Sequence, residues 1–333
     1  TQEHPTMTRV AAVDCGTNTI RLLVADLTRE ETGRPRLEPL RRRNEIVRLG
    51  QGVDRTGLLD PAALERTLAV VEDYAADCAE LGVEPGRGAR RFVATSATRD
   101  ARNREDFAAG VRSLLGVDPE VVSGQEEAHL SFAGSLLGAR GTDDGGAPRL
   151  VVDLGGGSTE LVLGVDAPAA AISLNTGSVR ITERYLADGV TPAAEAAARA
   201  EVRGLLDRAA QAVDLAATGR LVGLAGTITT VTAHALGLAD FDAEAIDGAE
   251  LAVGAALASC DEIVHSTAAE RESWAYLRPG RRDVIAAGAL VWSEVISRVV
   301  AETTAAGRPL AAAVTSLHDI LDGIALSLAV PVP

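Results

Sequence analysis

The sequence predicts an α/β protein made of two similar lobes around a central cleft. The first observation is a hairpin pattern at residues 151–164, where two apolar runs flank a turn of glycines and hydroxyl residues. The second is a weaker copy of this pattern at residues 13–25. The third is that strand-type and helix-type segments alternate after each copy. A duplicated unit of this kind implies two lobes of the same architecture.

Both predicted turns have residues suited to binding an anion. Glycines let backbone N–H groups converge on an anion because no Cβ blocks the approach. The first turn contains Gly16, Thr17, Asn18 and Thr19, and the second contains Gly155, Gly156, Gly157 and Ser158.

Acidic residues flank these turns. Aligned on the acid before each turn, Asp14 matches Asp153, and Arg21 matches Glu160. Asp153 and Glu160 are candidate ligands of a divalent cation, with Asp14 as a third candidate. For Asp14 alone, capping of the turn by its carboxylate is an equally good explanation.

The first half of the chain begins with the hairpin, at residues 10–26. Residues 29–43 are charged and contain Pro35 and Pro39, which predicts a loop leading into a short strand at 45–50. Asp60 followed by a proline marks the start of a helix that runs to about residue 81. The segments expected next are a strand at 91–95, a loop at 96–101 opening a helix to about 115, a strand at 120–123 and a helix at 124–139.

The second half follows a glycine-rich connection at residues 138–148. After the second hairpin we expect a strand and turn at 172–180, then a helix that carries Arg180 and Arg184. The remaining segments are a long helix at 192–218, a strand at 220–226 with a helix from 227, a helix at 251–265, an apolar helix after the turn at 278–283, a strand at 311–315 and a helix at 318–328.

The composition excludes several mechanisms. The chain has 333 residues and a net charge of −15, and its 32 basic residues are all arginine. Without lysine there is no Walker-type phosphate loop, Schiff-base enzyme or protein-kinase site. The negative charge argues against general binding to nucleic acid or to an anionic membrane. Three cysteines without metal spacing, and no apolar run of ~18 residues, lead us to expect a cytoplasmic protein without a membrane span.

Eight motifs occur along the chain, at residues 14–23, 47–54, 94–101, 123–128, 153–162, 179–184, 225–230 and 318–323. In this order they resemble the exopolyphosphatase / guanosine pentaphosphate phosphohydrolase (Ppx/GppA) family, in its short form without added C-terminal helical domains. The resemblance implies the fold of sugar kinases, actin and the Hsp70 ATPase, with actin-like, ribonuclease H-like lobes. We expect residues 1–131 plus a C-terminal helix at about 318–333 to form one lobe, and residues 132–317 the other.

The resemblance also implies the reaction. We expect hydrolysis of the terminal phosphoanhydride of inorganic polyphosphate by direct attack of water, with short chains as substrates, Mg²⁺ or Mn²⁺ as cofactor and a homodimer as the assembly. One alternative is 5′-phosphohydrolysis of guanosine pentaphosphate. The other is a non-catalytic sensor that binds polyphosphate or guanosine tetra- or pentaphosphate. With only nine aromatic residues to form a slot for a base, the composition favours polyphosphate.

Two neighbouring acids are candidates for the catalytic base. Ser123 and Glu126 have the spacing of a capping box, which gives Glu126 a structural role. Glu127 lies about 100° further round the helix and is left to face the substrate. The base of the family also aligns with Glu127, and Glu126 remains the alternative. Arg99, expected at the opening of its helix, is a candidate phosphate clamp together with Arg21.

Further arginines form two local groups. Arg180 and Arg184 share a predicted helix, and Arg278, Arg281 and Arg282 share a turn. Either group could follow the distant phosphates of a polyanion. The alternative is that these are exposed arginines balanced by nearby acids.

Overall fold

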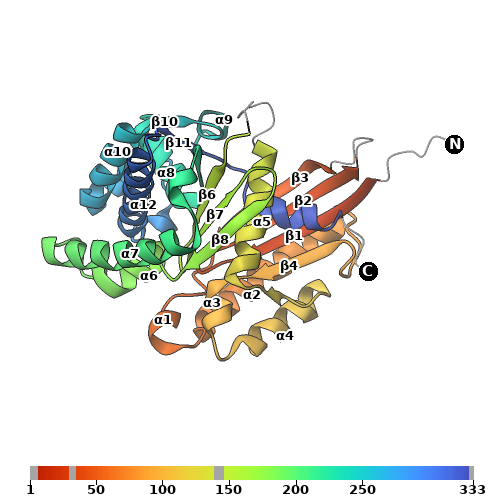
Figure 1. Ribbon diagram of the computed structural model, residues 1–333. Coiled ribbons are helices and arrows are strands. Elements are labelled where there is room, and N and C mark those ends of the chain that lie inside the picture. Colours follow the sequence, from red (N-terminus) through yellow and green to blue (C-terminus); the bar gives the residue numbers. More distant parts are fainter. Residues whose placement is uncertain (1–6, 30–34, 139–145, 330–333) are drawn as a thin grey trace. The chain divides into compact units, whose positions relative to one another are not determined.

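The computed structural model describes residues 7–29, 35–138 and 146–329 (Figure 1). The chain divides into two compact units. Unit 1 comprises residues 1–134 and 320–333, and unit 2 comprises residues 135–319. The boundaries expected from the sequence were 131/132 and 317/318.

Unit 1 is built on a mixed sheet with the strand order β3-β2-β1-β4-β5. Its strands are β1 (Met7–Cys15), β2 (Thr19–Arg29), β3 (Pro35–Ile46), β4 (Arg90–Ala94) and β5 (Glu120–Val121). β1 and β2 form the predicted antiparallel hairpin, whereas β4 runs parallel to β1 and β5 runs parallel to β4. The carboxyl ends of β1, β4 and β5 therefore meet at one edge, where open α/β sheets bind their ligands.

Helices cover both faces of the unit 1 sheet. On one face Val13 of β1 packs with α2 and α4, and on the other Val10 and Ala12 pack with α5 and α13. Burial on both faces explains why β1 is a continuous apolar run rather than an alternating one. The helices are α1 (Val53–Thr56), α2 (Pro61–Glu80), α3 (Ser96–Asp100), α4 (Arg104–Leu115), α5 (Gly124–Gly138), which crosses the unit boundary, and α13 (Ile320–Ser327).

Unit 2 repeats this sheet. Its strand order is β10-β11-β9-β6-β7-β8, for β6 (Arg149–Leu154), β7 (Thr159–Gly164), β8 (Pro168–Leu174), β9 (Arg220–Leu224), β10 (Glu250–Ala252) and β11 (Ala312–Thr315). β6, β7 and β8 correspond to β1, β2 and β3, while β9 and β11 correspond to β4 and β5. In each unit the first three strands are antiparallel and the next two run parallel to the first. The predicted duplication is therefore confirmed, with β10 as an addition at one edge.

The unit 2 helices pack on one face of this sheet through Leu150, Val152 and Leu161. They are α6 (Ser178–Ile181) with a π-turn (Thr182–Leu186), α7 (Pro192–Ala212), a 3₁₀ turn (Leu215–Ala217), α8 (Ala225–Ala235), α9 (Ala243–Ile246), α10 (Val253–His265), α11 (Ala268–Ser273), a second 3₁₀ turn (Pro279–Arg281) and α12 (Ile285–Ala305).

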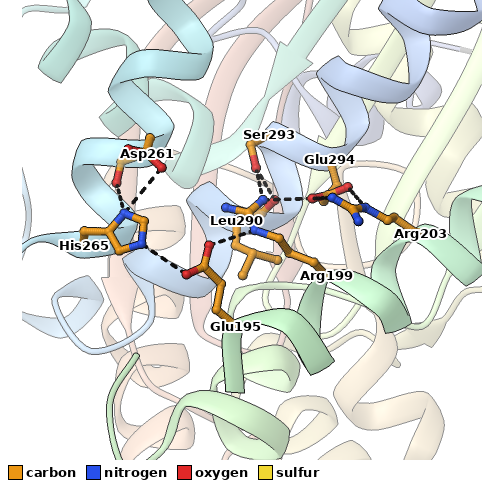
Figure 2. Close-up of polar contacts among 8 residues, drawn as sticks. All are labelled: Glu195, Arg199, Arg203, Asp261, His265, Leu290, Ser293 and Glu294. Carbon is orange, nitrogen blue, oxygen red and sulfur yellow. Dashed lines mark hydrogen bonds and ion pairs between the residues drawn. The ribbon is translucent and has the colours of Figure 1, made fainter. Parts of the chain in front are cut away.

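A polar network ties α7, α10 and α12 together (Figure 2). Glu294 of α12 is only 6% exposed and accepts hydrogen bonds from Arg199 at 2.8 Å and Arg203 at 2.7 Å. Arg199 also binds Glu195 at 2.8 Å, and Nε2 of His265 lies 3.1 Å from Glu195. Because a buried charge is costly without partners, this network favours one arrangement of the three helices.

The loop predicted at residues 29–43 is wrong from residue 35 onward, where β3 begins. Pro35 is the first residue of β3, and Pro39 pairs with Ala25 next to a shift in register between β2 and β3. Strand β3 is an edge of the sheet, so no further strand requires the N–H groups that the prolines lack. The edge position and the shift in register thus allow a strand where the prolines predict a loop.

Other segments differ in smaller ways. The predicted helix at 192–218 ends at Ala212, and α8 begins two residues earlier than expected, at Ala225. Most of the connection predicted at 138–148 lies outside the described residues. Cys15, Cys78 and Cys260 are buried thiols, and burial raises the pKa of each. Within residues 7–29, 35–138 and 146–329, no helix has the length and apolar character needed to cross a membrane.

Candidate active site

The turn of the first hairpin follows β1 at the carboxyl edge of the unit 1 sheet. The carbonyl of Thr17 accepts from the N–H of Gly50 at 2.8 Å, and the carbonyl of Asn18 accepts from the N–H of Arg48 at 2.9 Å. In a trans peptide the C=O and the following N–H point in opposite directions. The N–H groups of Asn18 and Thr19 therefore point away from the loop after β3.

The turn of the second hairpin has the same construction. The carbonyls of residues 155–157 all accept hydrogen bonds from the start of α6: the N–H groups of Ser178 and Arg180 donate at 3.1 Å, and Nε of Arg180 donates to Gly157 at 2.8 Å. The following N–H groups, at residues 156–158, point to the other side. Among the described residues no acceptor is found for the N–H of Gly156 or Gly157. Such converging donors form a concavity for an anion.

Both turns are closed by the same bond, and the second turn is backed by a glycine. Gly16 donates to the Thr19 carbonyl at 2.9 Å, and Gly155 donates to the Ser158 carbonyl at 3.0 Å. A Cβ at Gly177 would lie 2.6 Å from the carbonyl oxygens of residues 155 and 156. The loop can therefore approach the second turn only because residue 177 has no side chain.

Each hairpin carries a pair of polar residues directly opposite one another. In unit 1 Asp14 faces Arg21, and Nη2 of Arg21 lies 2.7 Å from Oδ2 of Asp14. In unit 2 Asp153 faces Glu160, and these residues are 7% and 1% exposed. Directly opposed residues project from the same face of a sheet. The first pair is neutral, whereas the second brings two buried acids together.

Glu126 and Glu127 begin α5 and have different surroundings. The N–H of Glu126 donates to the Ser123 hydroxyl at 3.2 Å, which is one half of the predicted capping box. The carboxylate of Glu126 is 46% exposed and lies 3.4 Å from Arg91. The carboxylate of Glu127 is only 9% exposed and lies 3.3 Å from Nη1 of Arg99. Glu126 thus lies at the surface and contributes to the start of the helix, whereas the carboxylate of Glu127 is buried and fixed by an arginine.

The expected position of Arg99 is wrong. Arg99 does not open a helix but lies in the last turn of the short helix α3, and α4 begins only at Arg104. Its Nη1 donates to the Val122 carbonyl at 2.8 Å as well as to Glu127. The buried residues Thr95 and Ser96, rather than Arg99, occupy the start of α3.

The further arginines are spread over unit 2. Arg180 is buried and holds the second turn through Gly157, so it lies at the turn itself. Arg184 forms an ion pair with Glu201. Arg281 lies against Gly226, where a Cβ would be 1.7 Å from its Nη1. Arg278 is exposed, and Nη2 of Arg282 donates to the Glu272 carbonyl at 3.3 Å.

The second hairpin has side chains that fit a divalent cation. In the part of the chain that the structure describes, no three His, Cys, Asp or Glu side chains gather as a metal site. Mg²⁺, however, is commonly held by one or two carboxylates together with substrate phosphates and water. Asp153 and Glu160 offer such a pair of carboxylates. Asp14 is already neutralised by Arg21, which favours a structural role for it, so its metal role stays a prediction.

Comparison with known proteins identifies the family. The model of the Ppx/GppA phosphatase family matches residues 27–305. The chain belongs to the Ppx/GppA phosphatase family. It is 44% identical over 329 residues to exopolyphosphatase 2 of Mycobacterium tuberculosis, an alignment that covers 97% of this chain and 99% of that protein.

Solved structures of Ppx/GppA proteins share the fold. A crystal structure of an exopolyphosphatase-like protein matches with a TM-score of 0.90 and 42% identity, over 96% of this chain and 97% of that one. A family member from Aquifex aeolicus matches with a TM-score of 0.75 and 25% identity, over 97% and 98% of the two chains. The fold class is thus confirmed: the duplicated sheets are the two actin-like lobes of this family.

Three residues that contact the candidate site residues of this Ppx/GppA protein are not recognised in the sequence. Arg91 of β4 contacts Glu126, Gly177 backs the second turn, and Ser173 of β8 donates to Glu160. The sequence offers an indication for Ser173, because it is a hydroxyl residue in an otherwise apolar segment at residues 168–174. The pairing that places it opposite Glu160 depends on the turn between β7 and β8 and on a shift in register, neither of which the sequence specifies.

Proposed function

We propose that the chain is an exopolyphosphatase that releases orthophosphate from the end of inorganic polyphosphate, with short chains as the preferred substrates. The observation that carries this proposal is the identity of 44% to an exopolyphosphatase over nearly the whole of both chains. The duplicated turns support it, because each of them has N–H groups suited to a phosphate group.

In this proposal Glu127 is the base. The oxygen of a water attacks the terminal phosphorus, and the bond from that phosphorus to the bridging oxygen breaks. Glu127 takes the proton of the water, and the shortened polyphosphate leaves with the bridging oxygen. The ion pair with Arg99 supports this role because it fixes the direction of the carboxylate. Glu126 remains the alternative base.

The other residues bind charge. The turns at residues 16–19 and 155–158 are assigned to phosphate oxygens through their other N–H groups, because those of Gly16 and Gly155 close the turns. Arg21 remains a candidate although it already binds Asp14. Asp153 and Glu160 would hold Mg²⁺ or Mn²⁺. When bound, that cation would neutralise developing charge on phosphate oxygens. Phosphates further along the polyphosphate are assigned to four arginines, Arg184, Arg278, Arg281 and Arg282.

The experiment measures phosphate release from polyphosphates of graded length and from guanosine pentaphosphate, with and without Mg²⁺. We expect release from short polyphosphate. Glu127→Gln is expected to lower kcat about 100- to 10,000-fold, the range for loss of a general base. Glu126→Gln is the matched control, since it makes the same change one residue away on an exposed carboxylate.

The outcomes separate the alternatives. Full activity in Glu127→Gln with loss in Glu126→Gln would reassign the base to Glu126. Faster release from guanosine pentaphosphate than from any polyphosphate would make the alarmone the substrate. Tight binding of polyphosphate without release would identify a sensor. The homodimer and the cytoplasmic location belong to the same proposal, and light scattering and cell fractionation test them.

A further inference from the structure

Three residues form a polar row across the unit 2 hairpin and its next strand. Asp153 of β6 faces Glu160 of β7, and Glu160 faces Ser173 of β8. Directly opposed residues share a face of the sheet, so the three side chains project to the same side. Glu160, the middle member, is 1% exposed.

The hydroxyl of Ser173 holds the carboxylate of Glu160. Its Oγ donates to Oε1 of Glu160 at 2.7 Å. This hydrogen bond lies in a partly buried setting, where it is electrostatically stronger than in water. Because β7 lies between β6 and β8, Ser173 approaches Glu160 from the side opposite Asp153.

The matching row of unit 1 has no such hydroxyl. There Asp14 faces Arg21, and Arg21 faces Asn44 of β3. The acid of this row is neutralised by its own arginine at 2.7 Å. The hydroxyl thus occurs in the row that has two acids, and it donates its hydrogen bond to the middle residue of that row.

We propose that Ser173 is a positioning residue that fixes the Glu160 carboxylate for the divalent cation. This inference rests on the proposed function, which assigns that cation to Asp153 and Glu160. Hydrogen bonds to metal-ligating carboxylates orient the ligand, and their loss typically weakens metal binding about 10- to 100-fold.

The test measures Mn²⁺ binding to the full chain by electron paramagnetic resonance of the free ion, without substrate. Ser173→Ala is expected to weaken Mn²⁺ binding about 10- to 100-fold. Ser173→Thr keeps the hydroxyl and suits a strand, so it is expected to retain the affinity of the wild type. Glu160→Gln, which removes the ligand itself, is expected to abolish binding at this site.

A matched control removes a hydroxyl elsewhere in unit 2. Ser259 of α10 donates to the Val231 carbonyl at 3.0 Å, on a helix outside β6, β7 and β8. Ser259→Ala is expected to leave Mn²⁺ affinity unchanged. Thermal unfolding of each variant separates a change in metal binding from a change in folding.

The outcomes distinguish this inference from the proposed function. Wild-type affinity in Ser173→Ala, with binding lost in Glu160→Gln, would overturn the role of Ser173 and leave the metal site standing. Ser173→Thr as weak as Ser173→Ala would also overturn it. Unchanged binding in Glu160→Gln would overturn both the metal site and the role of Ser173. Failure of the proposed function has a separate readout, which is absence of phosphate release while Mn²⁺ binding is intact.

Discussion

Arg99 holds Glu127 by the same nitrogen that binds the main chain. Nη1 of Arg99 lies 3.3 Å from Oε2 of Glu127 and 2.8 Å from the Val122 carbonyl. Val122 directly follows β5, and Glu127 lies in the first turn of α5. The guanidinium therefore connects α3 to the end of β5 and to the carboxylate, which is the geometry of a residue that orients its partner.

This geometry predicts how Arg99→Met changes the kinetics. If Arg99 orients Glu127, kcat for polyphosphate is expected to fall about 10- to 100-fold, the equivalent of one charge-assisted hydrogen bond, with little change in KM. Steady-state phosphate release measures both constants. Arg104→Met is the control, because Arg104 is an exposed arginine at the start of α4. A large rise in KM with unchanged kcat would instead support the phosphate clamp expected from the sequence.

The features predicted correctly from the sequence are local. The turn residues around Gly16 and Gly155, with apolar runs on both sides, specify two hairpins without reference to the rest of the chain. Their repetition specifies two lobes, and the order of strands and helices after each turn gives the α/β class. The capping of α2 by Asp60 is equally local, since the carboxylate accepts from N–H groups two and three residues later.

The features that were missed depend on partners distant in the sequence. Pro39 predicts a loop because proline lacks a hydrogen-bond donor. Its position in an edge strand, where no further strand needs that donor, allows it to be part of β3. The partners of Arg99 lie 23 and 28 residues away, and Ser173 meets Glu160 through strand register. The cleft expected between the lobes stays a prediction, as do the site residues.

The close packing behind the second turn predicts a cost for Gly177→Ala. A Cβ would lie 2.6 Å from two backbone oxygens, and backbone cannot move aside as a side chain can. The backbone at residue 177 is extended, so the cost is steric. We expect the free energy of unfolding to fall by about 1–3 kcal/mol, the range for overpacking, together with loss of phosphate release. Urea unfolding and activity assays measure the two effects.

Gly204→Ala is the matched control for this variant. Gly204 lies inside α7, and apart from its chain neighbours and the backbone of its own helix no described atom lies within 4 Å of the position of its missing Cβ. Alanine is favoured over glycine in a helix interior, so this variant is expected to be more stable by about 0.5–1 kcal/mol. A Gly177→Ala protein as stable and active as the wild type would contradict the packing argument.

The network in Figure 2 predicts unequal effects for two arginines that bind the same acid. The side chain of Arg199 is 20% exposed and that of Arg203 is 64% exposed, while both contact the buried Glu294. Arg199→Met removes the less exposed partner and is expected to cost about 3 kcal/mol of unfolding free energy. Arg203→Met, at an exposed pair, is expected to cost at most about 1 kcal/mol. Equal costs in urea unfolding would show that Arg199 is not the main partner.

His265 makes part of this network depend on pH. The hydrogen bond to Glu195 raises the pKa of His265 above its ordinary value of 6.5, burial opposes the rise, and the Asp261 carbonyl adds to it. The pKa of Glu195 is lowered: burial would raise it, but the bonds from Arg199 and His265 outweigh this. At pH values between the folded pKa of Glu195 and the folded pKa of His265, both side chains are charged in the folded protein.

Stabilisation by His265 is therefore expected to be complete below the unfolded pKa of the imidazole, about 6.5, and to be lost as pH rises through the higher folded pKa. The variant His265→Gln removes the charge. Its unfolding free energy should lie below that of the wild type by a few tenths to about 1 kcal/mol at about pH 5.5, and should match it at about pH 9. The effect is small because the imidazole is 49% exposed. Urea unfolding at both pH values measures the difference, and added salt should reduce it at the lower pH. A difference that grew with pH would have the wrong sign for an ion pair between His265 and Glu195.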